Sequence, residues 1–138
     1  MSQPLASVLL DTDILSAVMR QQPAALARAR AYLAVYHHLT FSIITRYEIL
    51  RGLHAKKAIA QLAAFDRLCS VSMILPLTDA IVVQAATIYA ALHQRGTLIG
   101  DADILIAATG IEHGLVVVTN NQSHYQRIGD IKLENWLA

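Results

Sequence analysis

Short apolar runs and longer amphipathic stretches alternate along this chain. The apolar runs, of which "GLVVVT" (114–119) is the most continuous, are typical of strands buried on both faces of a sheet. The stretches between them repeat apolar residues every three or four positions, as one face of a helix does. This pattern predicts strands at residues 7–10, 39–44, 72–77, 114–119 and 130–136, and helices at residues 12–21, 24–36, 45–53, 55–68, 78–95 and 102–112.

Alternation of strands and helices determines the expected fold class. Helices that connect successive strands return the chain to the same end of the sheet, which makes neighbouring strands parallel. We therefore predict an α/β fold, a three-layer α/β/α sandwich around a central parallel sheet of four to five strands. The predicted helix at 78–95 has the clearest apolar face and is expected to bury it in the core; that face comprises Ile81, Val82, Ala85, Ile88, Tyr89 and Leu92.

Length and composition restrict the possibilities further. The chain has 138 residues, 55% of them hydrophobic and 15% charged, which suits one folded domain over residues 1–138 and is too apolar for disorder. This apolar composition also predicts that part of the protein surface is hydrophobic and contacts a partner. The net charge is +1 and no basic run occurs, so any contact with nucleic acid is expected at a local site.

The sequence favours a reducing compartment. Cys69 is the sole cysteine, which excludes an intramolecular disulfide and a cysteine-based zinc site. The N-terminal stretch has no basic region of the signal-peptide kind. No stretch without Asp, Glu, Lys or Arg is longer than 80–94, which is shorter than the roughly 18 apolar residues that a membrane span needs. We therefore expect a cytoplasmic protein with no membrane segment.

Acidic residues recur where the predicted strands end. Asp11 directly follows the first strand, Glu48 lies in the first turn of the helix after the second, and Asp103 opens the helix before the fourth. Thr119 and Asn121 lie at the end of that fourth strand. In an open parallel sheet these positions meet at one edge. Clustered carboxylates need a proton or a cation to neutralise them, and oxygen ligands of this type suit Mg²⁺ or Mn²⁺.

Each acid also has a local interpretation as a helix cap. Asp11 or Asp13 can cap the helix at 12–21. Thr45 and Glu48 have the spacing of a capping box. An acid at 101 or 103 can cap the helix at 102–112 or add favourable charge to its N-terminus. Because helix N-termini and strand ends lie at the same edge of such a sheet, both interpretations stay open at this stage.

Four segments together resemble a known family. "LLDTDILS", "SIITRYEILRG", "IGDADILIAATGIEHG" and "LVVVTNNQSHY" are similar, in order and spacing, to the successive motifs of PIN-domain proteins, particularly VapC-type toxins of bacterial toxin–antitoxin pairs. The resemblance covers residues 7–136. It implies that Asp11, Glu48 and Asp103 bind Mg²⁺, or Mn²⁺, and leaves Asp101 as a helix cap. The supporting positions that it implies are Thr12, Asp13, Ser42, Thr119 and Asn121.

The resemblance also implies an activity and partners. It points to a metal-dependent endoribonuclease in which water attacks an RNA phosphodiester in line and leaves a 5′-phosphate and a 3′-hydroxyl. The expected partners are RNA, an antitoxin whose C-terminal segment occupies a groove and the active site, and a second copy of the chain in a homodimer. Two departures stand out: Asp13 replaces the usual Asn, and Asn121 replaces a fourth acid, which leaves the number of ions open. Of the six histidines, only His124 lies near the predicted site.

Three alternatives remain. The chain can be a PIN nuclease that processes RNA without a toxin role, or a PIN scaffold that binds without catalysis. It can also be an aspartate-based phosphohydrolase, because Asp11-x-Asp13 and "IGDAD" echo that class. Against the phosphohydrolase, the late acids here open a helix where that class ends a strand. Its active-site lysine also lacks a counterpart, because Lys56 and Lys57 lie in a predicted helix.

Overall fold

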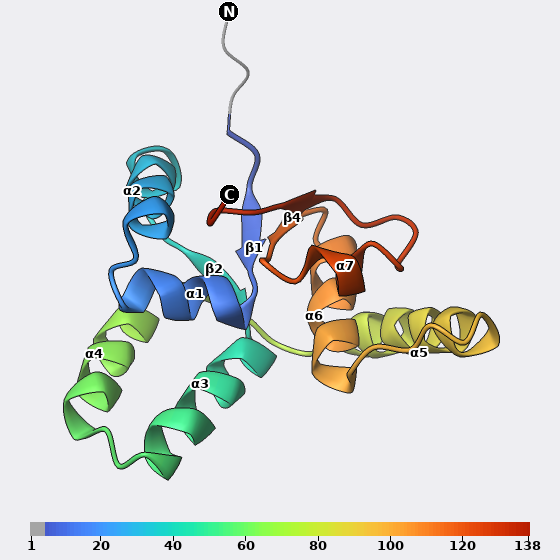
Figure 1. The fold of residues 1–138 in the computed structure, drawn as a ribbon, viewed down its shortest axis with the longest axis horizontal. Helices are drawn as coiled ribbons and strands as arrows, with labels where there is room; N and C mark the ends of the chain where they lie inside the picture. The colour runs from blue at the N-terminus through green and yellow to red at the C-terminus, as the bar shows by residue number, and fades with distance from the viewer. Residues whose placement is uncertain (1–4) are drawn as a thin grey trace, which may run out of the picture.

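A computed structural model of the chain describes residues 5–138 and contains one five-stranded sheet (Figure 1). All paired strands are parallel, and their order is β3-β2-β1-β4-β5, so the first strand lies in the middle. The predicted domain of residues 1–138 includes residues 1–4, which lie outside the described part. The strands are β1 (Val8–Leu10), β2 (Thr40–Ser42), β3 (Met73–Leu75), β4 (Val116–Val118) and β5 (Leu133–Glu134).

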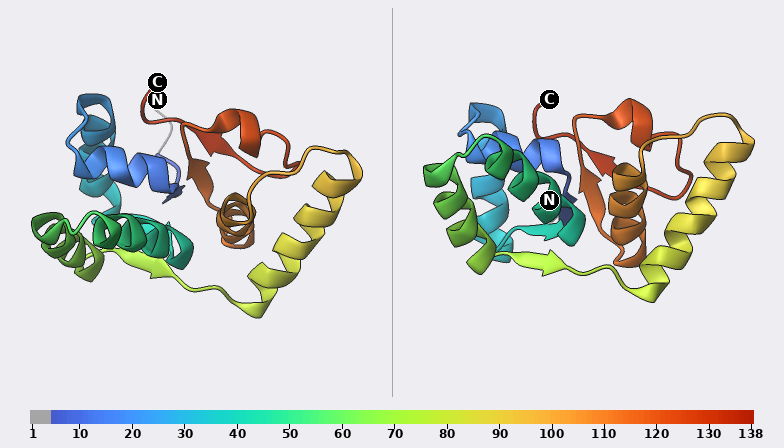
Figure 2. Two further views of the ribbon diagram at one scale, coloured as in Figure 1. Left: turned by 60° about the horizontal axis from the view of Figure 1, so that its bottom comes forward. Right: turned by 90° about the horizontal axis from the view of Figure 1, so that it is seen from below.

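Helices cover both faces of this sheet, which confirms the predicted α/β/α sandwich (Figures 1 and 2). Along β1, Leu9 faces the core under α5 and α6, whereas Val8 and Leu10 face the core under α1, α2 and α4. This alternation is the side-chain period of a strand buried on both faces. The helices are α1 (Thr12–Met19), α2 (Pro23–Tyr36), α3 (Ile43–Ala55), α4 (Ile59–Ser70), α5 (Asp79–Gln94), α6 (Asp101–Glu112) and α7 (Gln122–Tyr125).

Several predicted boundaries were wrong. Strand β2 ends at Ser42 and not at residue 44, because the Ser42 side chain accepts hydrogen bonds from the next amides and starts α3 there. Glu48 therefore lies in the second turn of α3, not in the first. Helix α4 begins at Ile59, later than predicted, and the four-residue helix α7 was not predicted at all.

The apolar face of α5 is only partly core. Ile81, Ile88 and Leu92 are buried as predicted. Val82 and Tyr89, which were expected on the same face, are 49% and 44% exposed. The apolar stripe is wider than the side of the helix that the rest of the chain covers, so α5 keeps exposed apolar side chains at Val82 and Tyr89. Within residues 5–138, no helix is long and apolar enough to cross a membrane.

Candidate active site

Asp11 is the central residue of the predicted site. It directly follows β1 and is 5% exposed. Its Oδ1 accepts a hydrogen bond from the backbone amide of Thr12 at 2.8 Å, and its Oδ2 accepts one from the Thr119 hydroxyl at 2.8 Å. Asp11 thus caps α1, as the local interpretation proposed, and also ties the end of β1 to the end of β4.

The electrostatic surroundings of Asp11 disfavour its charged form. Burial, followed by the charge of Asp13, raises the pKa of Asp11 to about 7, although the hydrogen bonds from Thr119 and Thr12 lower it. The charge of Asp103 adds to the increase. A proton or a bound cation would therefore stabilise the carboxylate of Asp11.

This pKa predicts how pH changes the stability of the protein in EDTA. Because the folded pKa of Asp11 lies above the unfolded value of about 4, the folded state loses stability as pH rises from about 4 to about 7. Asp11→Asn removes this loss and keeps an oxygen for the Thr12 amide. We expect similar Tm values for both proteins at pH 4, and a Tm about 10 °C higher for the variant at pH 8, because about three pKa units correspond to roughly 4 kcal/mol. Thermal melts followed by circular dichroism measure this, and a Tm difference independent of pH would contradict it.

Glu48 is connected to the Asp11 motif by a hydrogen bond from Thr12. The Thr12 hydroxyl donates to Glu48 Oε1 at 2.7 Å and lies 3.0 Å from the Thr45 hydroxyl. Glu48 Oε2 lies 3.6 Å from Arg51 Nη2. The capping-box interpretation of Thr45 and Glu48 was wrong, because Ser42 caps α3 with bonds from the amides of Ile44 and Thr45, which frees Glu48 for the site.

Asp103 lies in the first turn of α6, near enough to Asp11 for its charge to raise the pKa of Asp11. The cap of this helix is Gly100, so the expected capping role of Asp101 was wrong; Asp101 is exposed in the first turn. Asp103 Oδ1 accepts a hydrogen bond from the Tyr125 hydroxyl at 3.4 Å, and its Oδ2 lies 3.5 Å from His124 Nδ1. Helices α3 and α6 contact each other, which places the Glu48 and Asp103 helices side by side.

The remaining supporting residues bind the segment that follows β4. Asp13 Oδ2 accepts a hydrogen bond from the Asn120 amide at 3.0 Å, while Asp13 Oδ1 is buried without a partner in the described structure. Burial raises the pKa of Asp13. The backbone amide of Asn121 donates to the Thr119 hydroxyl at 3.0 Å, and its side-chain nitrogen lies 2.7 Å from His124 Nδ1.

The donor set fits a divalent cation in its chemistry. The charges of Asp13 and Asp103 both raise the proton affinity of Asp11, and Asp13 Oδ1 has no hydrogen-bond donor within the described residues. Hard oxygen ligands of this type match Mg²⁺ and Mn²⁺. Within residues 5–138, however, no three Asp, Glu, His or Cys side chains have the spacing of a metal site; Glu48 is held by Thr12 and Arg51. That Asp11, Glu48 and Asp103 bind one ion stays a prediction.

The structure adds two residues that sequence reasoning had not placed in the site. Tyr125 lies on the short helix α7, which shows no periodicity in the sequence and which directs the Tyr125 hydroxyl to Asp103. Arg51, on the same helix as Glu48, pairs with it. The (i, i+3) spacing of Glu48 and Arg51 was the available signal for that pair.

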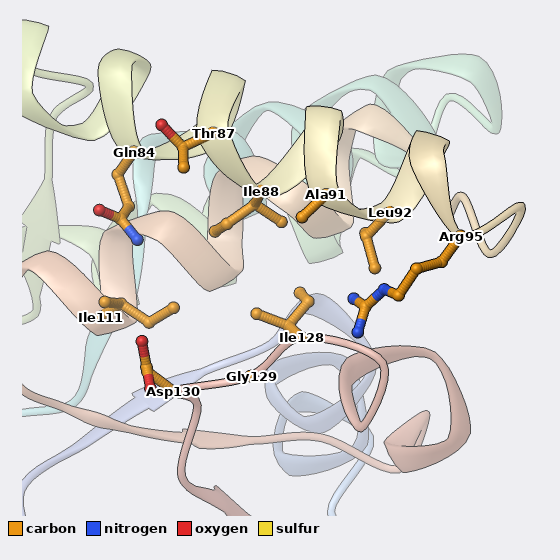
Figure 3. A pocket seen from close by; sticks show the side chains of 10 residues that line it. All are labelled: Gln84, Thr87, Ile88, Ala91, Leu92, Arg95, Ile111, Ile128, Gly129 and Asp130. Carbon is orange, nitrogen blue, oxygen red and sulfur yellow. The ribbon is translucent and has the colours of Figure 1, made fainter.

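A separate pocket of about 160 Å³ lies between α5 and the segment after α7 (Figure 3). Ile88, Leu92, Ile111 and Ile128 line its apolar part, and Arg95 stands at one end. It contains none of the predicted site residues. The acidic site and this pocket are therefore distinct features of the molecule.

Comparison with known proteins agrees with this geometry. The family model described as "PIN domain" matches residues 8–130, a range that contains every residue of the candidate site. The chain belongs to the PIN domain family. The PIN assignment confirms the resemblance found in the four sequence motifs.

The PIN relatives are ribonucleases. "Ribonuclease VapC1" of Haemophilus influenzae (strain R2866) is 26% identical over 129 residues, which cover 93% of this chain and 96% of that protein. "tRNA(fMet)-specific endonuclease VapC" of Salmonella typhimurium is 34% identical over 101 residues, 71% of this chain and 75% of that protein. A solved structure, DNA-bound VapBC from Salmonella typhimurium, matches with a TM-score of 0.85 and 28% identity over 96% of this chain and 99% of that chain.

Proposed function

We propose that this PIN protein is a metal-dependent endoribonuclease and the toxin of a type II toxin–antitoxin module, acting as a single domain over residues 1–138. The observation that carries the proposal is the hydrogen-bonded set of acids at the sheet edge. Asp11 is held by Thr12 and Thr119, Glu48 by Thr12, and Asp103 by Tyr125. The names of the VapC relatives support ribonuclease activity.

In this proposal Asp11, Glu48 and Asp103 hold Mg²⁺, with Mn²⁺ as a substitute. When bound, such an ion polarises a phosphate and lowers the pKa of a water molecule. Thr12 and Thr119 orient the carboxylate oxygens of Glu48 and Asp11 through their hydroxyl groups. The proposed reaction joins a water oxygen to phosphorus and breaks the bond to the 3′ oxygen, which takes up a proton and leaves as the 3′-hydroxyl.

The hydrogen bonds of Asp13 disfavour the phosphohydrolase alternative. That class uses the second Asp of D-x-D as a general acid, but here Asp13 Oδ2 accepts from the Asn120 amide, and Asp13 serves to hold the loop after β4. The late acids open helix α6, as the sequence predicted. The two Asp residues of the motif therefore have different hydrogen-bonding roles.

An antitoxin and a second copy of the chain are the proposed protein partners. The solved relatives from Salmonella typhimurium and Rickettsia felis are described as VapBC bound to DNA. On this chain, α5 exposes Val82, Val83 and Tyr89 at 49%, 58% and 44%. Exposed apolar side chains on one helix are a surface that protein partners cover.

RNA cleavage by the purified protein tests the enzyme proposal. We expect cleavage of RNA in the presence of Mg²⁺ or Mn²⁺ and at least a hundredfold slower cleavage in EDTA, on the order of the several kcal/mol that a metal ion supplies. Mapping the product ends shows whether a 5′-phosphate results. Undiminished cleavage in EDTA would disprove the metal-dependent mechanism.

Growth arrest on induced expression tests the toxin role. Wild-type protein is expected to stop growth, and Asp103→Asn at the same expression level is the matched control that leaves growth normal. RNA cleavage in vitro without growth arrest would instead support a PIN nuclease of RNA processing.

A further inference from the structure

We propose that Tyr125 is a positioning residue of the nuclease site, whose hydroxyl orients the carboxylate of Asp103 as a metal ligand. This inference rests on the proposed metal-dependent nuclease. It assigns a role in that site to a residue outside the set of acids and threonines.

The placement of the Tyr125 hydroxyl is the first observation. Tyr125 is 0% exposed, and its ring belongs to the hydrophobic core that also contains Ile104 and Ala107 of α6. The ring is therefore fixed by packing, while its hydroxyl emerges at the acidic edge and donates to Asp103 Oδ1 at 3.4 Å. A buried tyrosine hydroxyl needs a polar partner, and here that partner is a proposed metal ligand.

The direction of the hydrogen bond follows from the chemistry of its surroundings. Carboxylates only accept hydrogen bonds, so the phenol is the donor. The ordinary pKa of a phenol is about 10, so this hydroxyl carries a proton at neutral pH. Tyr125 therefore supports the carboxylate of Asp103 without adding a charge that competes with a cation.

The neighbouring histidine does not perform this role. His124 Nδ1 lies 3.5 Å from Asp103 Oδ2, but it also lies 2.7 Å from the side-chain nitrogen of Asn121. An amide nitrogen only donates, so the Asn121 side chain competes with Asp103 for His124 Nδ1. Within residues 5–138, Tyr125 is then the side chain that donates to Asp103.

We expect the Tyr125 hydroxyl to affect metal affinity more than the rate of the chemical step. The Tyr125 hydroxyl fixes Oδ1 of Asp103 and leaves Oδ2 on the side of His124, whose side chain is 42% exposed. Side chains that orient metal ligands typically contribute about 10- to 100-fold to metal affinity or activity. The Tyr125–Asp103 distance of 3.4 Å is longer than the roughly 2.5–3.0 Å of most O–H···O bonds, which places the expected effect near the lower end.

Tyr125→Phe removes only the hydroxyl and tests the proposal. Mn²⁺ binding to the RNA-free protein, measured by isothermal titration calorimetry, is expected to weaken by about tenfold or more. The Mg²⁺ concentration for half-maximal RNA cleavage is expected to rise by the same factor, with kcat at saturating Mg²⁺ within about threefold of wild type.

Tyr32→Phe is the matched control. Tyr32 is also a buried tyrosine, 4% exposed, and its hydroxyl accepts a hydrogen bond from the Val8 amide at 3.1 Å, on a core-facing side away from the acids. We expect both variants to lose a similar amount of thermal stability and only Tyr125→Phe to lose metal affinity. Equal losses of affinity would show a general packing effect and overturn the proposal.

Two further outcomes separate failure of this inference from failure of the nuclease proposal. His124→Ala is expected to bind Mn²⁺ within about threefold of wild type; a tenfold loss would make His124 the positioning residue and overturn our assignment. Wild-type affinity in Tyr125→Phe would overturn this inference and leave the nuclease proposal intact. A wild-type protein that neither binds Mn²⁺ nor cleaves RNA would overturn both.

Discussion

Asp11→Asn and Asp103→Asn are each expected to slow RNA cleavage by at least about a thousandfold. Both substitutions remove a charged oxygen ligand from the proposed ion, whose stabilisation of the transition state is worth several kcal/mol, and about 4 kcal/mol corresponds to a thousandfold. Asp11→Asn preserves the acceptor for the Thr12 amide, so the fold is expected to persist. Initial rates on a fluorogenic RNA at saturating Mg²⁺ measure the effect.

Asp13→Asn is the matched substitution in the same motif. Asp13 accepts from the Asn120 amide through one oxygen, and the side-chain oxygen of Asn can accept the same bond. We expect the variant to retain its activity within about threefold.

The contrast between the two positions decides between two mechanisms. If Asp11→Asn loses most of its RNA cleavage and Asp13→Asn loses little, the motif contains one essential acid. Equal losses from Asp11→Asn and Asp13→Asn would contradict this assignment and reopen the phosphohydrolase interpretation, in which both carboxylates react. Melting curves of each variant show whether a loss of activity reflects unfolding.

Gly110→Ala is expected to lower Tm by about 5–10 °C, the result of roughly 1–3 kcal/mol of overpacking. A Cβ at position 110 would lie 2.6 Å from Val117 Cγ2, and the valine side chain on β4 has little rotational freedom to give way. Gly110 thus sets the close approach of α6 to β4. These two elements carry Asp103 and lead into Thr119, so this contact also fixes the distance between the two sides of the site.

Two comparisons isolate the steric cause at Gly110. Gly52 lies in α3 with nothing within 4 Å of an added Cβ, so Gly52→Ala is expected to raise stability by up to about 1 kcal/mol through its helix propensity. In a Val117→Ala background the crowding atom is absent, and Gly110→Ala is expected to be neutral or stabilising. Thermal or urea unfolding measures both. The steric explanation fails if Gly110→Ala is equally destabilising in the wild-type and Val117→Ala backgrounds.

Much of the fold could be predicted because it depends on local pattern. The apolar runs and helical faces identified all five strands and six of the seven helices within residues 5–138. The short α7 was not predicted, because four residues are too few to show a period. Boundaries shifted where a side chain ended one element and started the next, as Ser42 does between β2 and α3.

The exposed apolar side chains of α5 show the limit of periodicity. Val82 and Tyr89 fit the helical face in sequence and are exposed in the structure. A periodic pattern gives the direction of the apolar stripe but not the width of the surface that the rest of the chain covers. That width depends on how α5 packs against α6, which no local pattern contains.

For the site, the sequence by itself determined which acids lie at the carboxyl edge of the sheet, because strand polarity and helix starts follow from the order of elements. It also determined the family, through motifs in the right order. Only the tertiary structure decided which groups bind one another: Thr12 with Glu48, Thr119 with Asp11, and Tyr125 with Asp103. These partners are 22 to 108 residues apart, and strand order β3-β2-β1-β4-β5 together with core packing brings them together. A hydrogen bond requires its donor and acceptor within about 3.5 Å, and such precision comes from the packed core and not from the sequence pattern.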